Sequence, residues 1–476
     1  MKQLFPHIFL LIILSGCRKY LEPPLPIDSI AGSDAFSNDA TAGGILSGVY
    51  GQLYNRGNFD GINSIGGTTG LYGDELQNFV TLIPDYPALY TDQVSSAVGM
   101  VTTIWTNLYG QLYSVNQAIE GLSPATNLNY RSQWLGEAYF TRAFLYFYLT
   151  NLYGDVPLVL SSDYLTNNSL GRSPRADVYK QIVADLLQAQ TLLDNKYHDA
   201  GGQVTTLRGR PNQAAATALL ARVYLYTGDY KDAETRAGTL IADAADFQLV
   251  SPAQTFLVNS TEIIWGIEPF QLLGPSYIVK DAHDYFLPNG ATPISGSVRF
   301  SLSDSLVKAF EPGDARYTSW VGADTVAAGG STPMTIYYFD YKYKAAGTYT
   351  APQESVVLFR LAEQYLIRAE ARAQQNNLPG ALADLDAIRT RAGLPASTAV
   401  SQAEVLNAIQ RERRVELFLE VGHRLFDLRR TGSLDEVMNT LAPKKGGSWA
   451  SFKEWWPIPL TDIQNDTHLI QTPGYQ

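Results

Sequence analysis

Residues 134–160, WLGEAYFTRAFLYFYLTNLYGDVPLVL, decide the fold that we expect for this chain. From residue 143 to residue 149 the stretch is apolar on nearly every face, so a helix here must be buried on most of its sides. Its polar groups lie only at the shoulders, for example Glu137 and Asn151. Gly154 can adopt the left-handed conformation that ends a helix, and Pro157 prevents the helix from resuming. Such a helix is not stable alone, and we expect layers of other helices around it.

The composition is that of an ordinary globular protein with a large core. The chain has 476 residues, of which 45% are hydrophobic and 17% are charged, and it can hold two or three domains or one large helical array. The net charge is −11 and the pI is near 5.0, so nucleic acid and anionic membrane surfaces are poor partners for the body of the protein. The 29 tyrosines suit either the contacts between packed helices or half-wet binding surfaces.

The N-terminus has the pattern of a lipoprotein leader. Lys2 precedes an apolar run, residues 4–14, which is too short to cross a bilayer and predicts a signal peptide over residues 1–16. The LSGC that follows ends on Cys17, the single cysteine, and resembles a bacterial lipobox. That resemblance implies cleavage before Cys17 and lipid attachment to its sulfur, which would anchor the protein to a membrane. The alternative is an ordinary secretory signal that ends on a cysteine. Residues 17–33 carry three prolines and predict an extended, lipidated tether.

Helical patterns and one repeat organise residues 34–476 as a single domain. We expect helices over residues 41–54, 101–122, 174–193 and 402–430, loop at 57–70 and irregular chain at 71–90. Residues 221–233 and 369–381 share a helix, a small-residue turn and a second helix that opens on alanine, which resembles the tetratricopeptide hairpin. The sequence therefore predicts a mainly α fold with about four tetratricopeptide-like helix pairs. These repeats would occupy residues 37–244 and 353–432, and residues 433–476 would form a C-terminal strap.

Helical periodicity disappears between residues 245 and 352. Short β-like runs at 262–267 and 336–343 alternate with glycine, proline, serine and threonine. Aromatic residues continue throughout this insertion, among them Tyr337, Tyr338 and Tyr341. Binding residues commonly lie on loops that a rigid scaffold positions, so we expect the ligand region here.

Four separated pieces resemble the SusD/RagB family of outer-membrane nutrient-binding lipoproteins of Bacteroidetes. They are the lipobox with CRKYLE, AYFTRAFLYFYLTNLYGDVPLV, ALADLDAIRTRAGL with RERRVELFLEVGHRLFDLRRTG, and the closing WWPIPLTDIQNDTHLIQTPGYQ. The resemblance covers the whole chain in the right order. The departures from the family pattern, at Leu425, Asp466 and Thr472, do not touch the expected ligand region.

The resemblance implies a location, a partner and a ligand. A member of this family would be lipid-anchored in the outer membrane, face the cell exterior and act as a lid over a SusC-like TonB-dependent barrel. The ligand, usually an oligosaccharide and in some members a peptide, would be held between lid and barrel. The resemblance thus implies non-catalytic glycan binding for carbohydrate uptake by TonB-dependent transport.

The sequence lacks the common catalytic and cofactor motifs. The five histidines form no His-Glu-x-x-His zinc motif, and neither a Gly-x-Ser-x-Gly elbow nor a phosphate-binding Gly-x-x-x-x-Gly-Lys is present. We therefore expect no catalytic residue, no metal and no cofactor. Paired glycosidase carboxylates are recognised only in space, so a surface glycoside hydrolase or lyase stays open as one alternative. A ligand-free assembly scaffold for the transporter is the other.

Two segments offer the flat apolar faces and planar polar groups that sugar binding needs. The candidate ligand residues of the first are Asp74, Glu75, Asn78, Tyr86 and Tyr90. Those of the second are Tyr277, His283, Asp284, Tyr285 and Trp320. The family resemblance points to the same two zones, although no motif selects individual residues. We expect the adjacent Asp74 and Glu75 to bind sugar hydroxyls or cap a turn rather than to act as acid and base.

Other conspicuous residues fit structural roles. Trp105, Tyr109 and Trp265 have the spacing of core residues, and His423 fits a hydrogen bond within a charged helix. A set of charged residues predicts an ion network that holds the last long helix to the array: Arg413, Glu416, Glu420, Arg424 and Asp427. If exposed, such pairs would contribute only about 0–1 kcal/mol each. Trp455 and Trp456 precede two prolines and predict packing within the C-terminal strap.

Overall fold

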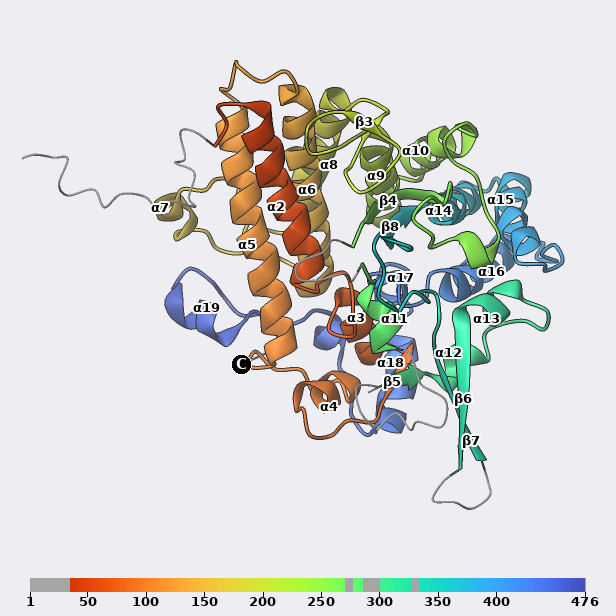
Figure 1. Ribbon diagram of the computed structural model, residues 1–476. Coiled ribbons are helices and arrows are strands. Elements are labelled where there is room, and N and C mark those ends of the chain that lie inside the picture. The colour runs from red at the N-terminus through yellow and green to blue at the C-terminus, as the bar shows by residue number, and fades with distance from the viewer. Residues whose placement is uncertain (1–34, 270–276, 286–299, 328–333, 476) are drawn as a thin grey trace, which may run out of the picture.

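The computed structural model describes residues 35–269, 277–285, 300–327 and 334–475. The predicted signal peptide (1–16), the lipid-attachment residue Cys17 and the tether (17–33) lie outside the described residues. Figure 1 shows two parts, an array of packed helices above and a region of short helices, loops and one long β-hairpin below. The chain is mainly helical with few short strands, which confirms the predicted fold class.

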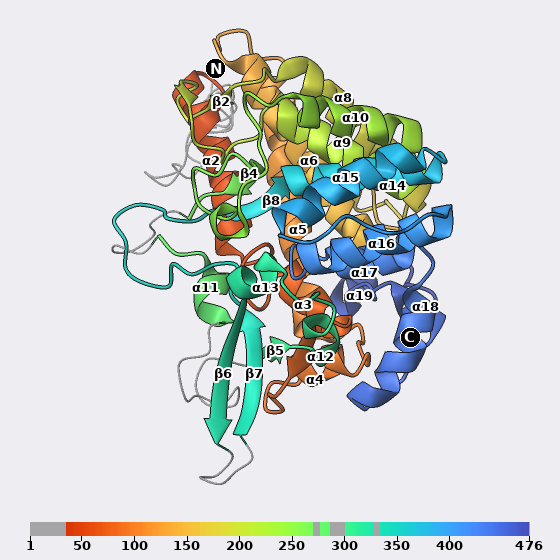
Figure 2. The same ribbon diagram turned by 90° about the vertical axis from the view of Figure 1, so that its right-hand side faces the viewer.

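The array consists of four helix pairs, as the sequence predicts. The first two are α2 (Asp39–Asn55) with α5 (Gly99–Leu122) and α6 (Arg131–Tyr153) with α8 (Arg175–Leu192). The last two are α9 (Gln213–Thr227) with α10 (Tyr230–Ala242) and α14 (Leu361–Gln374) with α15 (Leu378–Arg391). Helix α8 also contacts α9, and α10 contacts α14, so the last three pairs stack in chain order (Figure 2).

Helix α6 lies at the centre of the array, and every residue from 140 to 153 is buried. Its polar shoulders form buried ion pairs, because Glu137 lies 2.7 Å from Arg210 and Arg142 lies 2.7 Å from Asp185. Removing one partner of a buried pair leaves an uncompensated charge and costs about 3–5 kcal/mol. These ion pairs therefore fix the orientation of α6 about its own axis, which its otherwise apolar surface does not determine.

The end of α6 differs in detail from the prediction. Gly154 has the expected positive φ of 77°, but its ψ of −122° lies outside the left-handed helical region. A Cβ atom at this position would lie 3.1 Å from the ring of Trp455. Glycine is needed both for this backbone conformation and for the close approach of the strap.

The two repeat copies form the predicted hairpins. Gly228, in the left-handed conformation, ends α9, and Asn376, with a φ of 60°, follows α14 at the matching place. Ala233 and Ala381, near the start of the second helix of each pair, are fully buried. Small side chains at these positions let the two helices approach closely, as the tetratricopeptide resemblance implies.

The prediction of a loop over residues 57–70 is wrong in its second half, which forms α3 (Ile65–Tyr72). The glycines of this helix lie where other backbone segments approach. A Cβ atom on Gly66 would lie 2.4 Å from the carbonyl oxygen of Leu419, and one on Gly67 would lie 2.2 Å from that of Ile62. Glycine here serves close packing rather than a turn, and composition alone does not distinguish the two uses.

The helix predicted over residues 402–430 is two helices, α16 (Gln402–Glu416) and α17 (His423–Arg430). In the turn between them, Leu419, Val421 and Gly422 have positive φ angles of 55°, 39° and 86°. Such a conformation costs about 1–3 kcal/mol for a residue other than glycine, so surrounding contacts must impose it.

Side chains from distant segments supply those contacts. The buried Lys342 ammonium donates hydrogen bonds to the carbonyl oxygens of Glu416 (3.1 Å) and Phe418 (2.8 Å). The N–H of Leu419 donates to the Glu75 carboxyl group at 3.1 Å. A continuous helix would use these backbone groups internally, so tertiary hydrogen bonding overrides the helical sequence pattern.

The predicted ion network is present, but it is buried. Asp427 pairs with Arg413, another member of the predicted set, and also with Arg430. Glu420 pairs with Lys342 and Arg360 rather than with Arg424, because the turn separates the two helices. Side chains in these pairs are at most 9% exposed, so the small value for surface pairs does not apply.

The core predictions for tryptophan are confirmed. Trp105 and Trp265 are 2% and 0% exposed, and Tyr109 packs half-buried against Trp105 with ring centroids 4.6 Å apart. Trp456 is buried, and the Trp455 ring lies between the guanidinium groups of Arg175 and Arg429, at 4.2 and 4.0 Å. His423 is buried 3.8 Å from Glu363.

The remaining elements are short. Before the insertion they are β1 (Leu76–Asn78), α4 (Asp85–Tyr90), α7 (Tyr164–Asn167), β2 (Tyr197–His198) and β3 (Val204–Thr205). Within it they are η2 (Pro252–Gln254), β4 (Ile263–Ile267), α11 (Lys280–Asp284), β5 (Phe300–Leu302), α12 (Asp304–Val307), α13 (Ala315–Trp320), β6 (Val321–Ala327) and β7 (Met334–Asp340). After it they are β8 (Val356–Arg360), α18 (Leu434–Leu441), η4 (Ala442–Lys445), η5 (Ser451–Glu454) and α19 (Leu460–Asn465). The strands pair antiparallel as β1–β5, β2–β3, β4–β8 and β6–β7. The two β-like runs predicted in the insertion form β4 and β7. Residues 71–90, predicted to be irregular, contain β1 and α4.

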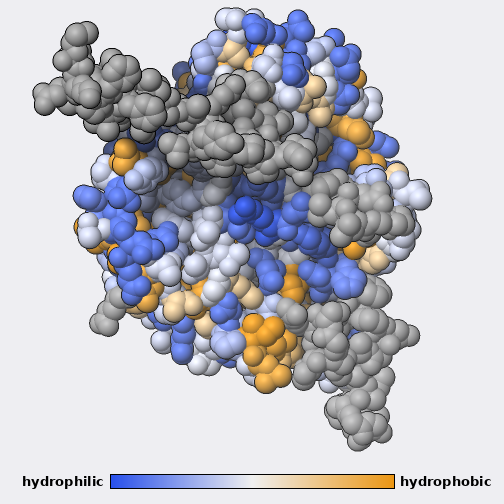
Figure 3. All heavy atoms as spheres, turned by 60° about the vertical axis from the view of Figure 1, so that its left-hand side comes forward, coloured by the Kyte–Doolittle hydropathy of each residue, from blue (hydrophilic) through white to orange (hydrophobic). Residues whose placement is uncertain are grey.

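The described surface is largely hydrophilic on the face drawn in Figure 3, where hydrophobic residues gather in small patches. Among the described residues, none of the helices combines the length and apolar character that a membrane crossing requires. The two most exposed large apolar side chains among the described residues, Leu82 and Val400, lie in loops far apart in the sequence. Most of the apolar surface of the helices is therefore used in the core.

Candidate functional site

The two segments that the sequence proposes as ligand region meet in the lower part of the molecule. Strand β1, from the first segment, pairs with β5, from the second, in the register Leu76 to Leu302 and Asn78 to Phe300. The Tyr86 ring packs edge-on against Phe300, with centroids 4.9 Å apart. Residues more than 200 positions apart in the chain thus form one region.

Helix α11 is fastened to the loop before α3 by reciprocal hydrogen bonds. The Asp60 carboxylate accepts the backbone N–H groups of Lys280 (3.0 Å) and Asp281 (3.2 Å). In return, Asp281 accepts the N–H of Gly61 at 2.7 Å, and Asp284 accepts that of Ile62 at 3.2 Å. Burial raises the pKa of Asp60 to about 6, although these N–H groups and the Lys280 charge lower it. These hydrogen bonds fix the segment that carries Tyr277 and His283 relative to the loop before α3.

Asp74 and Glu75 are both buried and bonded within the protein. Burial alone would raise the pKa of Asp74, but Arg424 and Arg414, each 2.8 Å away, hold it below its usual range. Burial and the neighbouring Asp74 charge raise the pKa of Glu75 to about 8, so Glu75 is largely protonated at neutral pH. A pair with separated pKa values resembles an acid–base pair, but these side chains are only 6% and 2% exposed. In this structure they hold the turn between α16 and α17.

Five of the predicted ligand residues are buried, and each is placed by its own contacts. In addition to Asp74 and Glu75, these are Tyr86, Tyr285 and Trp320. The Tyr86 hydroxyl donates to Asn63 at 2.9 Å, and the Trp320 indole N–H donates to the carbonyl oxygen of Pro252 at 2.7 Å. Their rings present no free face to a ligand in this structure.

The other five predicted residues keep accessible side chains. His283 is 57% exposed at its side chain, and the remaining four are half-buried: Asn78, Tyr90, Tyr277 and Asp284. The Asn78 amide is engaged locally, because it both donates to and accepts from the backbone of Val80 at 3.0 Å. The Tyr90 ring lies 5.3 Å from the Lys445 ammonium.

The β6–β7 hairpin carries aromatic residues of the insertion that are not among the candidate ligand residues predicted from the sequence. It projects away from the helical array in both ribbon views (Figures 1 and 2). On one face of β7, Phe339 lies 5.8 Å from Tyr341, and Phe79, just after β1, packs edge-on against Tyr337 at 5.5 Å. We call Phe79, Tyr337, Phe339 and Tyr341 the aromatic hairpin face. Its period of two along residues 337–341 is the sequence signal that identifies it.

The hairpin is fixed at its base and along its length. Gly322 lies opposite Phe339, and a Cβ atom there would lie 2.2 Å from the Phe339 ring. Only glycine allows the ring to lie across the partner strand. At the end of β7, the buried Lys342 is bonded to the turn between α16 and α17. The aromatic hairpin face is therefore held by the buried ion network.

The described residues contain no group of three or more histidine, cysteine, aspartate or glutamate side chains arranged to hold a metal ion. The chemistry available on the hairpin is that of ring faces and hydroxyl groups. Such groups stack on and hydrogen-bond to a ligand and do not by themselves cleave bonds.

Comparison with known families places the chain. The profile described as "SusD family" matches residues 296–475, and the one described as "Starch-binding associating with outer membrane" matches residues 72–225. The chain belongs to the SusD/RagB family. The two matches include the central helix, residues 381–432 and residues 455–475, which belong to three of the four pieces that carry the resemblance in the sequence.

Individual SusD relatives align over the full chain. SusD-like protein P2 of Formosa agariphila is 26% identical over 529 residues, covering 100% of both chains. The starch-binding protein SusD of Bacteroides thetaiotaomicron is 26% identical over 573 residues, covering 100% of this chain and 99% of its own. A solved structure named as a laminarin-binding SusD-like protein has a TM-score of 0.75 at 23% identity, with 92% of this chain and all of that chain covered. This SusD-like chain therefore shares the fold along nearly its whole length.

Proposed function

We propose that this SusD-like protein binds an oligosaccharide at the outer surface of the outer membrane and passes it unchanged to a SusC-like TonB-dependent transporter. The observation that carries the proposal is the aromatic hairpin face, presented away from the array on a rigid base. Relatives named as starch-binding and laminarin-binding support a carbohydrate ligand. The profile that refers to association with the outer membrane supports the location.

The half-buried rings of the aromatic hairpin face would supply most of the binding. Tyr337 and Tyr341 would stack on the C–H faces of sugar rings, while the accessible Asn78, Tyr90, Tyr277 and His283 would meet hydroxyl groups. The buried members of the predicted set, Asp74, Glu75, Tyr86, Tyr285 and Trp320, would shape the site from behind. Few groups contact the ligand in this arrangement, so binding is weak and reversible, as transfer to a barrel requires.

Catalysis is not part of the proposal. The one adjacent carboxylate pair in the ligand region, Asp74 and Glu75, is buried and engaged with Arg414, Arg424 and the α16–α17 turn. A glycosidase must bring two carboxyl groups to opposite sides of a sugar linkage. To do so, Asp74 would have to leave its ion pairs, and Glu75 would have to leave its hydrogen bond to the α16–α17 turn.

Titration of the chain lacking its leader with maltohexaose and laminarihexaose tests the proposal. We expect binding of at least one sugar and a weakening of about tenfold in Tyr337→Ala and Tyr341→Ala, since each loses a stacking ring. Tyr113→Ala is the matched control, because Tyr113 is a 47% exposed tyrosine on α5. Equal affinities in all variants would refute the role of the hairpin, and shorter sugar products would refute capture without cleavage.

The anchor and the partner need separate measurements. Labelling with a fatty acid should mark the full chain and not the Cys17→Ala variant, and protease treatment of intact cells should remove the protein if it faces outwards. An affinity-tagged full chain should co-purify with a TonB-dependent barrel from solubilised outer membranes. Purification without a barrel would count against the transport partnership.

A further inference from the structure

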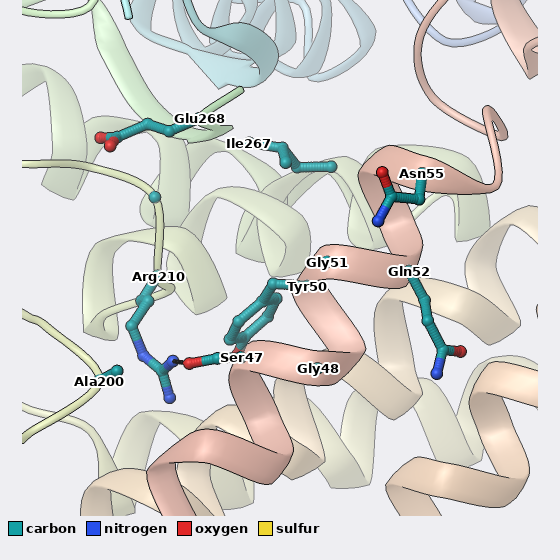
Figure 4. A pocket seen from close by; sticks show the side chains of 11 residues that line it. Ser47, Gly48, Tyr50, Gly51, Gln52, Asn55, Ala200, Arg210, Ile267 and Glu268 are labelled. Atoms are coloured by element: carbon teal, nitrogen blue, oxygen red, sulfur yellow. Dashed lines mark hydrogen bonds between the residues drawn. The ribbon is translucent and has the colours of Figure 1, made fainter. Parts of the chain in front are cut away.

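A separate cavity of about 580 Å³ lies beside α2, away from the aromatic hairpin face, with which it shares no residue. Figure 4 shows Ser47, Tyr50 and Arg210 on one side and Ile267 and Glu268, at the end of β4, on the other. A cavity of this size holds one or two sugar units. We call it the α2 cavity.

The inner wall of the α2 cavity is rigid and electrically balanced. Arg210 lies 2.7 Å from Glu137, donates to the Ser47 hydroxyl at 2.9 Å and lies 5.0 Å from the centre of the Tyr50 ring. The Tyr50 hydroxyl donates to Glu137 at 3.0 Å. Arg210 and Glu137 compensate each other's charge, so the wall can shape a ligand without reorganising.

Glu268 on the opposite wall is not satisfied in this way. Its Oε1 atom is buried and accepts no hydrogen bond from any described residue. Burial raises the pKa of this carboxyl group, although the backbone N–H of Arg208 lowers it. A buried acceptor without a donor costs about 1–3 kcal/mol, and a ligand hydroxyl would remove that cost.

Gly48 on α2 is a second unexplained feature. Glycine inside a helix costs about 1 kcal/mol relative to alanine, yet a Cβ atom at Gly48 would meet nothing within 4 Å. Close packing therefore does not require this glycine, in contrast to Gly43 of the same helix, where a Cβ atom would lie 2.1 Å from the carbonyl oxygen of Ala200. Its effect in the structure is to leave the cavity wall without a side chain.

We propose that the α2 cavity is a second saccharide site, in which a sugar unit donates a hydroxyl to Glu268 and lies against Gly48 and Ile267. This inference rests on the proposed function and gives it a longer ligand, because two separate sites on one protein favour chains that reach both. A hydroxyl-rich neutral ligand fits, since Arg210 and Glu137 compensate each other and the cavity offers an acceptor and an apolar wall.

Hydrogen–deuterium exchange of the chain lacking its leader, with and without maltohexaose and laminarihexaose, reads the two sites independently. We expect sugar to protect the peptides covering α2 and residues 200–210 as well as those of the β6–β7 hairpin. In the variants Gly48→Leu and Glu268→Ala, protection of α2 from exchange should require at least tenfold more sugar. The protection of the β6–β7 hairpin should stay unchanged. Gly44→Leu is the matched control, because Gly44 lies one turn earlier on α2, has open space around its Cβ position and does not line the cavity.

The outcomes separate the two proposals. Protection at the hairpin without protection at α2 would overturn the second site and leave the proposed function standing. Protection at α2 that Gly48→Leu and Glu268→Ala leave unchanged would also overturn it. Protection at neither place with either sugar would overturn both.

Discussion

The substitution Gly66→Ala tests the conclusion that the glycines of α3 are packing residues. In an ordinary helix interior, replacing glycine by alanine stabilises a protein by about 1 kcal/mol, because glycine loses more conformational entropy on folding. At Gly66 the added Cβ atom would lie 2.4 Å from the carbonyl oxygen of Leu419. We therefore expect the sign of the effect to reverse.

The magnitude follows from the size of the overlap. Protein Cβ atoms essentially never approach closer than 3.0 Å, so Leu419 or α3 must move by more than half an ångström. Leu419 is held on both sides, because it has a φ of 55° and its N–H donates to Glu75. Overpacking of this kind typically costs about 1–3 kcal/mol. After the helix gain of about 1 kcal/mol is subtracted, we expect a net destabilisation of up to about 2 kcal/mol.

Gly44→Ala on α2 is the control, since Gly44 is exposed and a Cβ atom there would meet nothing within 4 Å. It should stabilise the protein by up to about 1 kcal/mol. Urea unfolding followed by circular dichroism gives both values from the shift of the midpoint at constant slope. Equal shifts in the same direction for the two variants would refute the assignment of Gly66 to close packing. A change of slope in Gly66→Ala would instead mean that unfolding is no longer one transition.

Two further predictions concern the buried charges behind the ligand region. The pKa of Glu75 is raised from 4.5 to about 8, so the folded protein holds this proton more tightly than the unfolded chain does. The stability that this proton contributes is fully present in acid. It is lost as the pH rises between these two values, by up to about 1.4 kcal/mol per pH unit. Glu75→Gln keeps an acceptor for the Leu419 N–H, so its stability relative to the unchanged protein should rise from pH 5 to pH 8 in urea unfolding. A constant difference across that range would show that Glu75 titrates normally. Lys342→Met leaves two carbonyl oxygens and part of the Glu420 carboxylate unpaired, so it should destabilise the folded protein by about 3 kcal/mol or more. Lys308→Met is the control, because the Lys308 side chain is 78% exposed, and it should change the stability by no more than about 0.5 kcal/mol. Similar small shifts for both lysines would mean that the turn does not depend on Lys342.

Local sequence patterns predict the helical array well, for a physical reason. Helix α6 and the two repeat hairpins follow from apolar spacing, small residues and helix-ending glycines that act over a few positions. The two errors arise where distant segments decide the backbone. Gly66 resembles a loop residue until the chain near Leu419 is placed beside it, and the break after Glu416 follows from Lys342 and Glu75, which lie far away in sequence.

The sequence predicts which segments could bind a ligand, but not how deeply their residues are buried. Sugar binding and core packing use the same aromatic residues, so Trp320 and Tyr337 look equally suitable in the sequence, although one is fully buried and the other is half-buried on a projecting strand. The alternation of Tyr337, Phe339 and Tyr341 with the residues between them carries the missing information, because it assigns the rings to one side of a strand. The α2 cavity has no comparable signal, since its walls come from three separate segments.

The buried charges explain how the protein can hold an aromatic strand that projects from the helical array. A two-stranded hairpin is only marginally stable by itself, and flexible rings would lose entropy on binding. Here Lys342 ties the end of β7 to the α16–α17 turn, and Arg360 ties that turn to β8 through Glu416 and Glu420. The charges thus stabilise the geometry of the rings. Asp74 and Glu75 are buried behind the same turn, and a glycosidase would need both carboxyl groups beside the sugar linkage.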